Sequence, residues 1–314
     1  MGISAEEALD CFRSDDLIGI GMEADAIRRS LHPERVVSYL IDGRIAIAGE
    51  SAPEGIYAQA RESVDLGVTG LYLELARPTP PLAALEALLH GLRERFPDLW
   101  LHGLSASDIV PLAAAAGLGV RDTLAILRDA GLDSLAGDDA TLFGFDIAVA
   151  GRCRTADWFK VHRTAHQLGL RSTASMVFGL GESLEQRVEH LVLLRDLQQE
   201  TGGFTAFTPL SFRPASRTQV PDDWEPVTAV EYLRTLAISR MMLEDIPNIQ
   251  SNGTAEGLKV VQVALRFGAN DTGAISVTPA AAPRHAEEDI RRIIRDAGFR
   301  PAQRDTLYRT RFLD

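Results

Sequence analysis

Acidic residues and one histidine stand at the ends of several short apolar runs in the sequence. Glu74, His102 and the adjacent Asp138 and Asp139 each end or follow such a run. If the runs are parallel strands, their carboxyl ends meet at one face and these side chains converge. Converging carboxylates raise one another's pKa or bind a cation, and a carboxylate with a histidine can exchange protons with a ligand. We therefore predict these four residues as catalytic.

Other polar residues at the predicted strand ends are candidates for substrate binding. They are Glu50, Arg77, Ser175, Glu182, Arg213 and Asn252. The plainer interpretation is that these loops are solvated in an acidic protein, and that His102 is a hydrogen-bonded core residue. His162 and His166 have the i, i+4 spacing of a metal pair, but no acidic helper lies between them. We interpret that pair as surface or packing residues and predict no metal site.

The composition is that of a globular protein with an acidic surface. The 314 residues include 44 Asp and Glu against 32 Lys and Arg, a formal net charge of −12. Such a surface repels phosphate groups, which argues against nucleic acids and anionic membranes as main partners. The longest apolar stretch, 112–120, is about half a membrane span. With two cysteines and no recognisable leader, we expect a cytoplasmic protein.

Short apolar runs alternate with amphipathic helical segments along most of the chain. The predicted strands are 36–41, 44–48, 70–76, 99–105, 131–137, 171–179, 203–212, 248–253 and 274–279, and helices are predicted over 53–66, 82–95, 107–130, 155–169, 183–201, 227–245, 254–267 and 285–297. Counted from 44–48, the alternation gives eight strand–helix units, which is typical of a parallel (β/α)8 TIM barrel. A doubly wound open sheet is the alternative.

The barrel is expected to span residues 34–298. Residues 1–33 read as a helical extension, because Ser4 and Glu7 have the spacing of a capping box and Ser14 or Asp15 can begin a second helix. Residues 299–314 are left as a C-terminal tail without an assigned element.

Long stretches between Arg121 and Arg309 resemble the radical S-adenosylmethionine enzymes of the futalosine route to menaquinone. These include LRDAGLDSL (127–135), RTAHQLGLRSTASMVFG (163–179) and GLKVVQVALRFGANDTG (257–273). The resemblance implies a barrel fold. In that family a CxxxCxxC motif follows the segment equivalent to Gly43–Ile47 and binds a four-iron, four-sulfur cluster, whose free iron binds S-adenosylmethionine.

This chain departs from the family pattern at the positions that serve the cofactor. Ile47 leads directly into Ala48 and Gly49, and Cys11 and Cys153 lie far from this segment. Glu74 and Asp138 stand where family members have glycines that approach the cofactor, and Leu180 replaces a histidine. The resemblance with these departures implies neither an iron–sulfur cluster nor bound S-adenosylmethionine.

Three functions remain open from the sequence. The leading hypothesis is a cluster-free relative that binds a nucleoside-like or other small molecule in the barrel mouth and performs acid–base cyclase, lyase or isomerase chemistry. The second is a non-catalytic pseudoenzyme that pairs with a paralogous radical enzyme or with itself. The third is a metal-dependent barrel enzyme that uses the acidic mouth. No nucleic acid or membrane partner is expected.

Overall fold

The computed structural model describes residues 2–137, 139, 152–214, 224–277 and 284–313. Its elements alternate as the sequence predicts. The strands are β1 (Val36–Ile47), β2 (Gly70–Leu75), β3 (Trp100–Gly103), β4 (Ser134–Leu135), β5 (Arg171–Phe178), β6 (Phe204–Ser211), β7 (Asn248–Ile249) and β8 (Asp271–Val277). The helices between and after them are α3 (Pro53–Asp65), α4 (Leu82–Arg95), α5 (Ala106–Ala116), α6 (Val120–Asp129), α7 (Thr155–Gln167), α8 (Leu184–Thr201), α9 (Ala229–Met242), α10 (Gly253–Glu256), α11 (Leu258–Ala264) and α12 (Arg284–Asp296).

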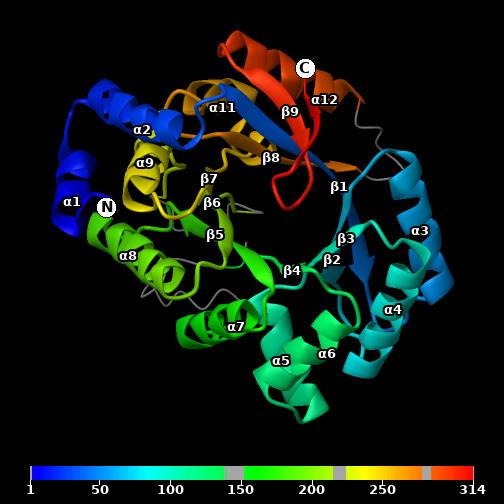
Figure 1. Ribbon diagram of the computed structural model, residues 1–314. Helices are drawn as coiled ribbons and strands as arrows, with labels where there is room; N and C mark the ends of the chain where they lie inside the picture. Colours follow the sequence, from blue (N-terminus) through cyan, green and yellow to red (C-terminus); the bar gives the residue numbers. More distant parts are fainter. Residues whose placement is uncertain (1, 138, 140–151, 215–223, 278–283, 314) are drawn as a thin grey trace.

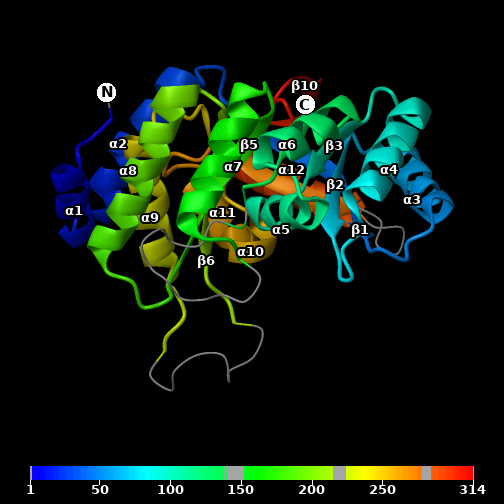
Figure 2. The same ribbon diagram turned by 90° about the horizontal axis from the view of Figure 1, so that it is seen from below.

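The strands form a curled sheet with the helices on its outer side (Figures 1 and 2). Strands β1 to β7 are neighbours in chain order, β8 pairs with β1, and all these pairings are parallel. Gln250, directly after β7, makes a parallel bridge to Asp271 at the start of β8. A doubly wound sheet reverses its strand order, so that alternative is wrong. The fold is a TIM-barrel-like α/β fold.

The helices expected over 107–130 and 254–267 are each divided in two, as α5 with α6 and as α10 with α11. The strands expected over 36–41 and 44–48 form the single strand β1. Asp42 and Gly43 interrupt the apolar pattern without ending the strand. A Cβ at Gly43 would lie 2.6 Å from Leu71 Cδ2 on the neighbouring β2, so a larger residue here would require the Leu71 side chain to move. The glycine therefore permits close strand packing and does not mark a turn.

The N-terminal segment forms two helices, α1 (Ala5–Arg13) and α2 (Leu17–Leu31), which pack against α8 and α9. The predicted capping box is confirmed, since Glu7 N–H donates to Ser4 Oγ and Ser4 N–H to Glu7 Oε2. The second helix is capped one residue later than expected, by Asp16. Within the described residues no single helix is long and apolar enough to cross a membrane; α5 and α6 have that length only together, bent by 104°.

A C-terminal hairpin that the sequence analysis did not predict enters the sheet. Strand β9 (Arg300–Arg304) pairs in parallel with residues 36–40 of β1, and β10 (Thr310–Leu313) pairs antiparallel with β9. Because β2 pairs with residues 42–47 of β1, the hairpin loop 305–309 lies near the start of β2. Figure 1 shows this loop reaching into the middle of the ring of strands.

Three histidines lie in the packing between helices and sheet: His162 and His190 are buried, and His166 is half-buried. His162 Nδ1 and His166 Nε2 both lie within hydrogen-bond distance of Ser172 Oγ, at 2.9 and 2.8 Å, and His190 Nε2 lies 2.9 Å from the Ser175 carbonyl oxygen. Burial lowers the pKa of each of the three to about 3. Of the two roles that the sequence left open, surface or packing, the structure therefore shows packing for His162 and His166.

These histidines are expected to make the fold sensitive to mild acid. An unfolded histidine has a pKa near 6.5, so between about pH 6.5 and 3 the unfolded chain binds more protons and stability falls as pH falls. At pH 5 each histidine contributes about 2 kcal/mol to this loss. Urea unfolding at pH 7 and pH 5 measures it. His190→Gln should reduce the difference in the free energy of unfolding between the two pH values. The same change at exposed His90 should leave that difference unchanged. An equal pH dependence in both variants would contradict the assignment.

Candidate functional site

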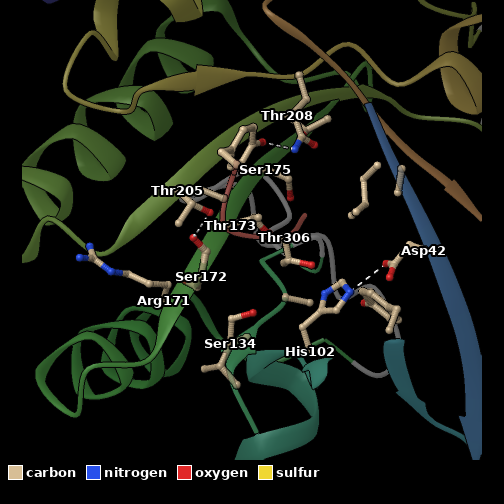
Figure 3. A pocket seen from close by; sticks show the side chains of 18 of the residues that line it. Asp42, His102, Ser134, Arg171, Ser172, Thr173, Ser175, Thr205, Thr208 and Thr306 are labelled. Atoms are coloured by element: carbon tan, nitrogen blue, oxygen red, sulfur yellow. Dashed lines mark hydrogen bonds and ion pairs between the residues drawn. The ribbon is translucent and has the colours of Figure 1, made fainter. Parts of the chain in front are cut away.

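A cavity of about 390 Å³ lies inside the curled sheet. Its wall is made by residues of β1 to β6 and β8, by Gln250 and Asn252 after β7, and by the hairpin loop through Thr306, Leu307 and Tyr308. Figure 3 shows side chains from separate strands pointing into this space. The strand pleat alternates side chains between the inside and the helix layer, and this alternation places polar groups from distant parts of the chain around one volume.

Hydroxyl groups dominate the polar part of the wall. Its serines and threonines are Ser134, Ser172, Thr173, Ser175, Thr205, Thr208, Ser276 and Thr306. Ser134 Oγ accepts from Trp100 Nε1 at 2.9 Å, and Ser175 Oγ donates to the Gly137 carbonyl oxygen at 2.7 Å. A hydroxyl group that makes one hydrogen bond can still donate or accept another. The wall can therefore offer both functions to a ligand rich in hydroxyl groups.

The charged part of the wall centres on Asp42 and His102. Asp42 in β1 is 4% exposed, and its Oδ2 lies 2.8 Å from His102 Nε2 in β3. This is an ion-pair distance, although the contact lacks hydrogen-bond geometry. The edge of the Tyr72 ring faces His102, with ring centroids 5.5 Å apart. In Figure 3 Asp42 and His102 point toward each other at one side of the cavity.

A buried ion pair fixes the hairpin at the end of the cavity. Arg304 in β9 donates to both carboxylate oxygens of Asp271 in β8, at 2.5 and 2.9 Å. Its guanidinium lies 3.9 Å from the centre of the Tyr308 ring, and Tyr308 Oη accepts from Gln250 Nε2. Burial raises the pKa of Tyr308, so the phenol stays protonated. Hairpin and sheet therefore form one connected polar network.

Of the residues predicted from sequence, His102, Ser175 and Asn252 line the cavity. Glu74 does not: its side chain is half-exposed, and Oε2 lies 3.1 Å from Arg44 Nη1. Glu50 is exposed in the turn after β1. The expected ring of carboxylates at the strand ends therefore does not gather around this cavity in the described part of the chain.

The remaining predicted residues lie apart from the cavity wall. Arg77 is exposed, and Arg213, 57% exposed, lies 3.7 Å from Glu256. Asp139 accepts hydrogen bonds from Ser107 N–H and Trp158 Nε1, so it holds the start of α5 against α7. Asp138 lies outside the described residues.

The Glu182 carboxylate is bonded to groups of the protein itself. Burial would raise the pKa of its carboxyl, but hydrogen bonds from Gly179 and Leu180 N–H and the Arg187 guanidinium bring the pKa below its usual value. An ionised carboxylate with these partners organises the turn between β5 and α8.

Sequence reasoning missed Asp42 and Thr306. One signal for Asp42 was available, because a carboxylate within an otherwise apolar strand faces either a partner or a site. Thr306 had none, since the hairpin that carries it was not predicted. In the described ranges, no three His, Cys, Asp or Glu side chains are grouped to hold a metal ion.

The segment after β1 does not fit an iron–sulfur cluster. Its turn is short: Ala48 N–H donates to Ser51 Oγ, Gly49 N–H donates to the Pro78 carbonyl oxygen, and α3 begins at Pro53. No thiol is present in it. Cys11 lies in α1 and Cys153 before α7, and burial raises the pKa of both, that of Cys153 to about 11. Thiolate ligands need the opposite shift.

Comparison with known proteins identifies a matching family model and several relatives with similar sequences. A family model described as the CofH/MqnC C-terminal region matches residues 201–314. The chain is 32% identical over 345 residues to the cyclic dehypoxanthine futalosine synthase of Streptomyces coelicolor, covering 98% of this chain and 85% of the relative. It is 37% identical over 276 residues to the 5-amino-6-(D-ribitylamino)uracil–L-tyrosine 4-hydroxyphenyl transferase of Methanothermobacter thermautotrophicus, covering 83% and 73%.

Solved structures share the fold at low identity. HydG, a maturase of the FeFe hydrogenase, superimposes with a TM-score of 0.70 at 14% identity, covering 96% of this chain and 72% of HydG. Methylornithine synthase (PylB) superimposes with a TM-score of 0.69 at 15% identity, covering 96% and 95%. At this identity the likeness concerns the fold alone.

Proposed function

Because the chain belongs to the family of futalosine-pathway radical S-adenosylmethionine enzymes, which includes the cyclic dehypoxanthine futalosine synthases, we propose that it is a cluster-free member that binds a nucleoside-like small molecule inside a complete (β/α)8 barrel. The reaction is polar acid–base chemistry, a cyclisation, elimination or isomerisation. The observation that carries the proposal is the short thiol-free turn after β1, in a fold whose curled sheet encloses a cavity.

Ligand size and chemistry support this substrate class. A cavity of about 390 Å³ lies within the usual range for small-molecule sites. The names of the relatives include a futalosine and a ribitylaminouracil, and the hydroxyl-rich wall suits the hydroxyl groups of a ribose or ribitol chain. Bridging of Gln250 to Asp271 supports closure of the barrel around such a ligand.

The cavity also supports the acid–base part of the proposal. His102 is the one histidine of the cavity wall in the described residues, and imidazole is the side chain most suited to proton transfer near neutral pH. Its neighbour Asp42 can orient the ring. The sequence analysis had instead predicted Glu74, Asp138 and Asp139 as the catalytic carboxylates that act with His102. The acid–base pair of this proposal is therefore His102 with Asp42.

The decisive measurement is iron content after anaerobic reconstitution with iron and sulfide. We expect a colourless protein without stoichiometric iron, which releases no 5′-deoxyadenosine from S-adenosylmethionine and dithionite. The matched control is a double Cys11→Ser, Cys153→Ser variant, which should behave identically, alongside a family member that carries the three-cysteine motif. Brown protein with stoichiometric iron would reject the cluster-free reading.

One observation favours the second candidate, a pseudoenzyme with a protein partner. Ile18 and Met22 stand one turn apart on α2 and are 65% and 66% exposed. Paired exposed apolar side chains are typical of contact surfaces. Light scattering of the wild type and an Ile18→Glu variant tests this: a dimer that dissociates in the variant supports it, and a monomer in both opposes self-association.

A further inference from the structure

Three buried polar atoms at one side of the cavity lack a hydrogen-bond partner in the ranges that the structure describes. They are Asp42 Oδ1, His102 Nε2 and Thr306 Oγ1. Of the three, His102 Nε2 has a contact at ion-pair distance, 2.8 Å from Asp42 Oδ2, but this contact lacks hydrogen-bond geometry. They come from β1, β3 and the hairpin loop, three segments that are distant in the sequence. Buried polar groups are nearly always paired, because an unpaired one costs free energy. Three at one place therefore need an explanation.

All three atoms surround a single glycine. A Cβ at Gly70, the first residue of β2, would lie 2.9 Å from Thr306 Oγ1, 3.0 Å from Asp42 Oδ1 and 3.4 Å from His102 Nε2. Gly70 is therefore the position at which any side chain would fill the space between them. Figure 3 shows Asp42, His102 and Thr306 facing the same region of the cavity.

Neighbouring charges do not satisfy Asp42 Oδ1. The nearby guanidinium of Arg304 is bonded to Asp271 through both Nε and Nη2, and to the Asp305 carbonyl oxygen through Nη1. The hydroxyls elsewhere on the wall differ from Thr306: Thr208 Oγ1, for example, donates to Gln250 Oε1 at 2.9 Å. Among the described residues that line the cavity, buried polar atoms without a hydrogen-bond partner are found only at this corner.

We propose that Asp42, His102 and Thr306 form an anchor for a hydroxyl group of the ligand, which donates to Asp42 Oδ1 and accepts from Thr306 Oγ1 or His102 Nε2. This inference rests on the proposed function only in taking the ligand to be a small molecule in the cavity. A neutral hydroxyl matches the mixed donor and acceptor set. The anchor assigns ligand contact to Asp42 and Thr306, which the sequence analysis did not single out.

The first test needs no ligand. Thr306→Val removes the hydroxyl at constant shape, so the melting temperature of the free protein should stay the same or rise, since no internal hydrogen bond is lost. The matched control is Thr208→Val, which removes a formed hydrogen bond and should lower the melting temperature by about 2 °C. A fall for Thr306→Val as large as the control's would overturn the anchor.

The second test is calorimetric titration with ribitol and with adenosine. Relative to the wild type, we expect about fivefold weaker binding for Thr306→Val and about tenfold to hundredfold for Asp42→Asn, the losses typical of neutral and charge-assisted hydrogen bonds. Gly70→Ala, whose Cβ meets only side-chain ends, should abolish binding. Asp65→Asn on the exposed end of α3 and Gly55→Ala in α3 serve as matched controls without effect on binding.

The outcomes separate the anchor from the proposed function. Ribitol that binds through the three residues while adenosine does not would support the anchor and reject the nucleoside class. Adenosine that binds the wild type and all three variants equally would overturn the anchor and leave the proposed function standing. Binding of neither probe to the wild type would overturn both.

Discussion

Replacing Asp271 with alanine is expected to lower the free energy of unfolding by about 3–5 kcal/mol, the typical cost of leaving one partner of a buried ion pair uncompensated. Both side chains of the pair are almost fully buried, at 4% exposure for Arg304 and 0% for Asp271. Asp271 also accepts from Gly273 N–H and from the Ser38 hydroxyl. Its loss therefore releases the hairpin from the sheet and leaves a buried guanidinium without its counter-charge. Urea unfolding of wild type and variant measures the change.

The matched control is Asp289→Ala on α12. Asp289 lies 2.7 Å from Arg292, but these side chains are 48% and 63% exposed. Exposed pairs contribute about 1 kcal/mol or less because water and salt screen them. If both aspartates gave similarly small losses, the Arg304–Asp271 pair would not hold the hairpin. The stability loss of Asp271→Asn should lie between those of Asp271→Ala and Asp289→Ala, since asparagine keeps the shape of the side chain and loses its charge.

Gly137→Ala is expected to destabilise the fold by about 3 kcal/mol, at the upper end for overpacking. A Cβ at this position would lie 1.9 Å from the Thr173 carbonyl oxygen, which is backbone and cannot rotate away. Gly137 also links β4 to β5, since its N–H donates to Thr173 Oγ1 and its carbonyl oxygen accepts from Ser175. The variant should distort this wall of the cavity as well, so ribitol binding should weaken with the melting temperature.

Gly55→Ala is the control for that change. It lies in α3, and a Cβ there would meet nothing within 4 Å. Alanine in place of an open helical glycine stabilises by up to about 1 kcal/mol. If Gly55→Ala and Gly137→Ala changed the free energy of unfolding by equally small amounts, β4 and β5 would be able to move apart at little cost, and the prediction would be wrong.

Most of the fold could be predicted because its elements have strong local signals. The helix over 82–95 is confirmed as α4, with apolar residues at Leu85, Leu89 and Leu92 facing the core, and the strand over 171–179 is confirmed as β5. The hairpin could not be predicted, because β9 is stabilised by pairing with β1 and not by its own pattern. Residues Arg300–Arg304 include a proline and three polar side chains, an unusual strand sequence.

The candidate site was predicted only in part. The rule that function lies at the carboxyl ends of barrel strands selected Glu74 and Arg213, which the structure places outside the cavity wall. It could not select Asp42, which lies midway along β1. Thr306 closes the cavity from the opposite direction, so the polar contacts lie deeper than the strand ends. How far the polar contacts lie from the strand ends depends on which segment closes the other end of the barrel. The periodicity of the strands does not indicate which segment that is.

The pairing of β9 with β1 joins segments that lie far apart in the sequence. Residues 36–40 are synthesised before β2 to β8, whereas their partners at 300–304 are synthesised after them. Long-range pairing of this kind is slow, because a large loop must close before any contact forms. The part of the cavity wall that Thr306, Leu307 and Tyr308 supply is therefore completed only after this slow pairing has formed.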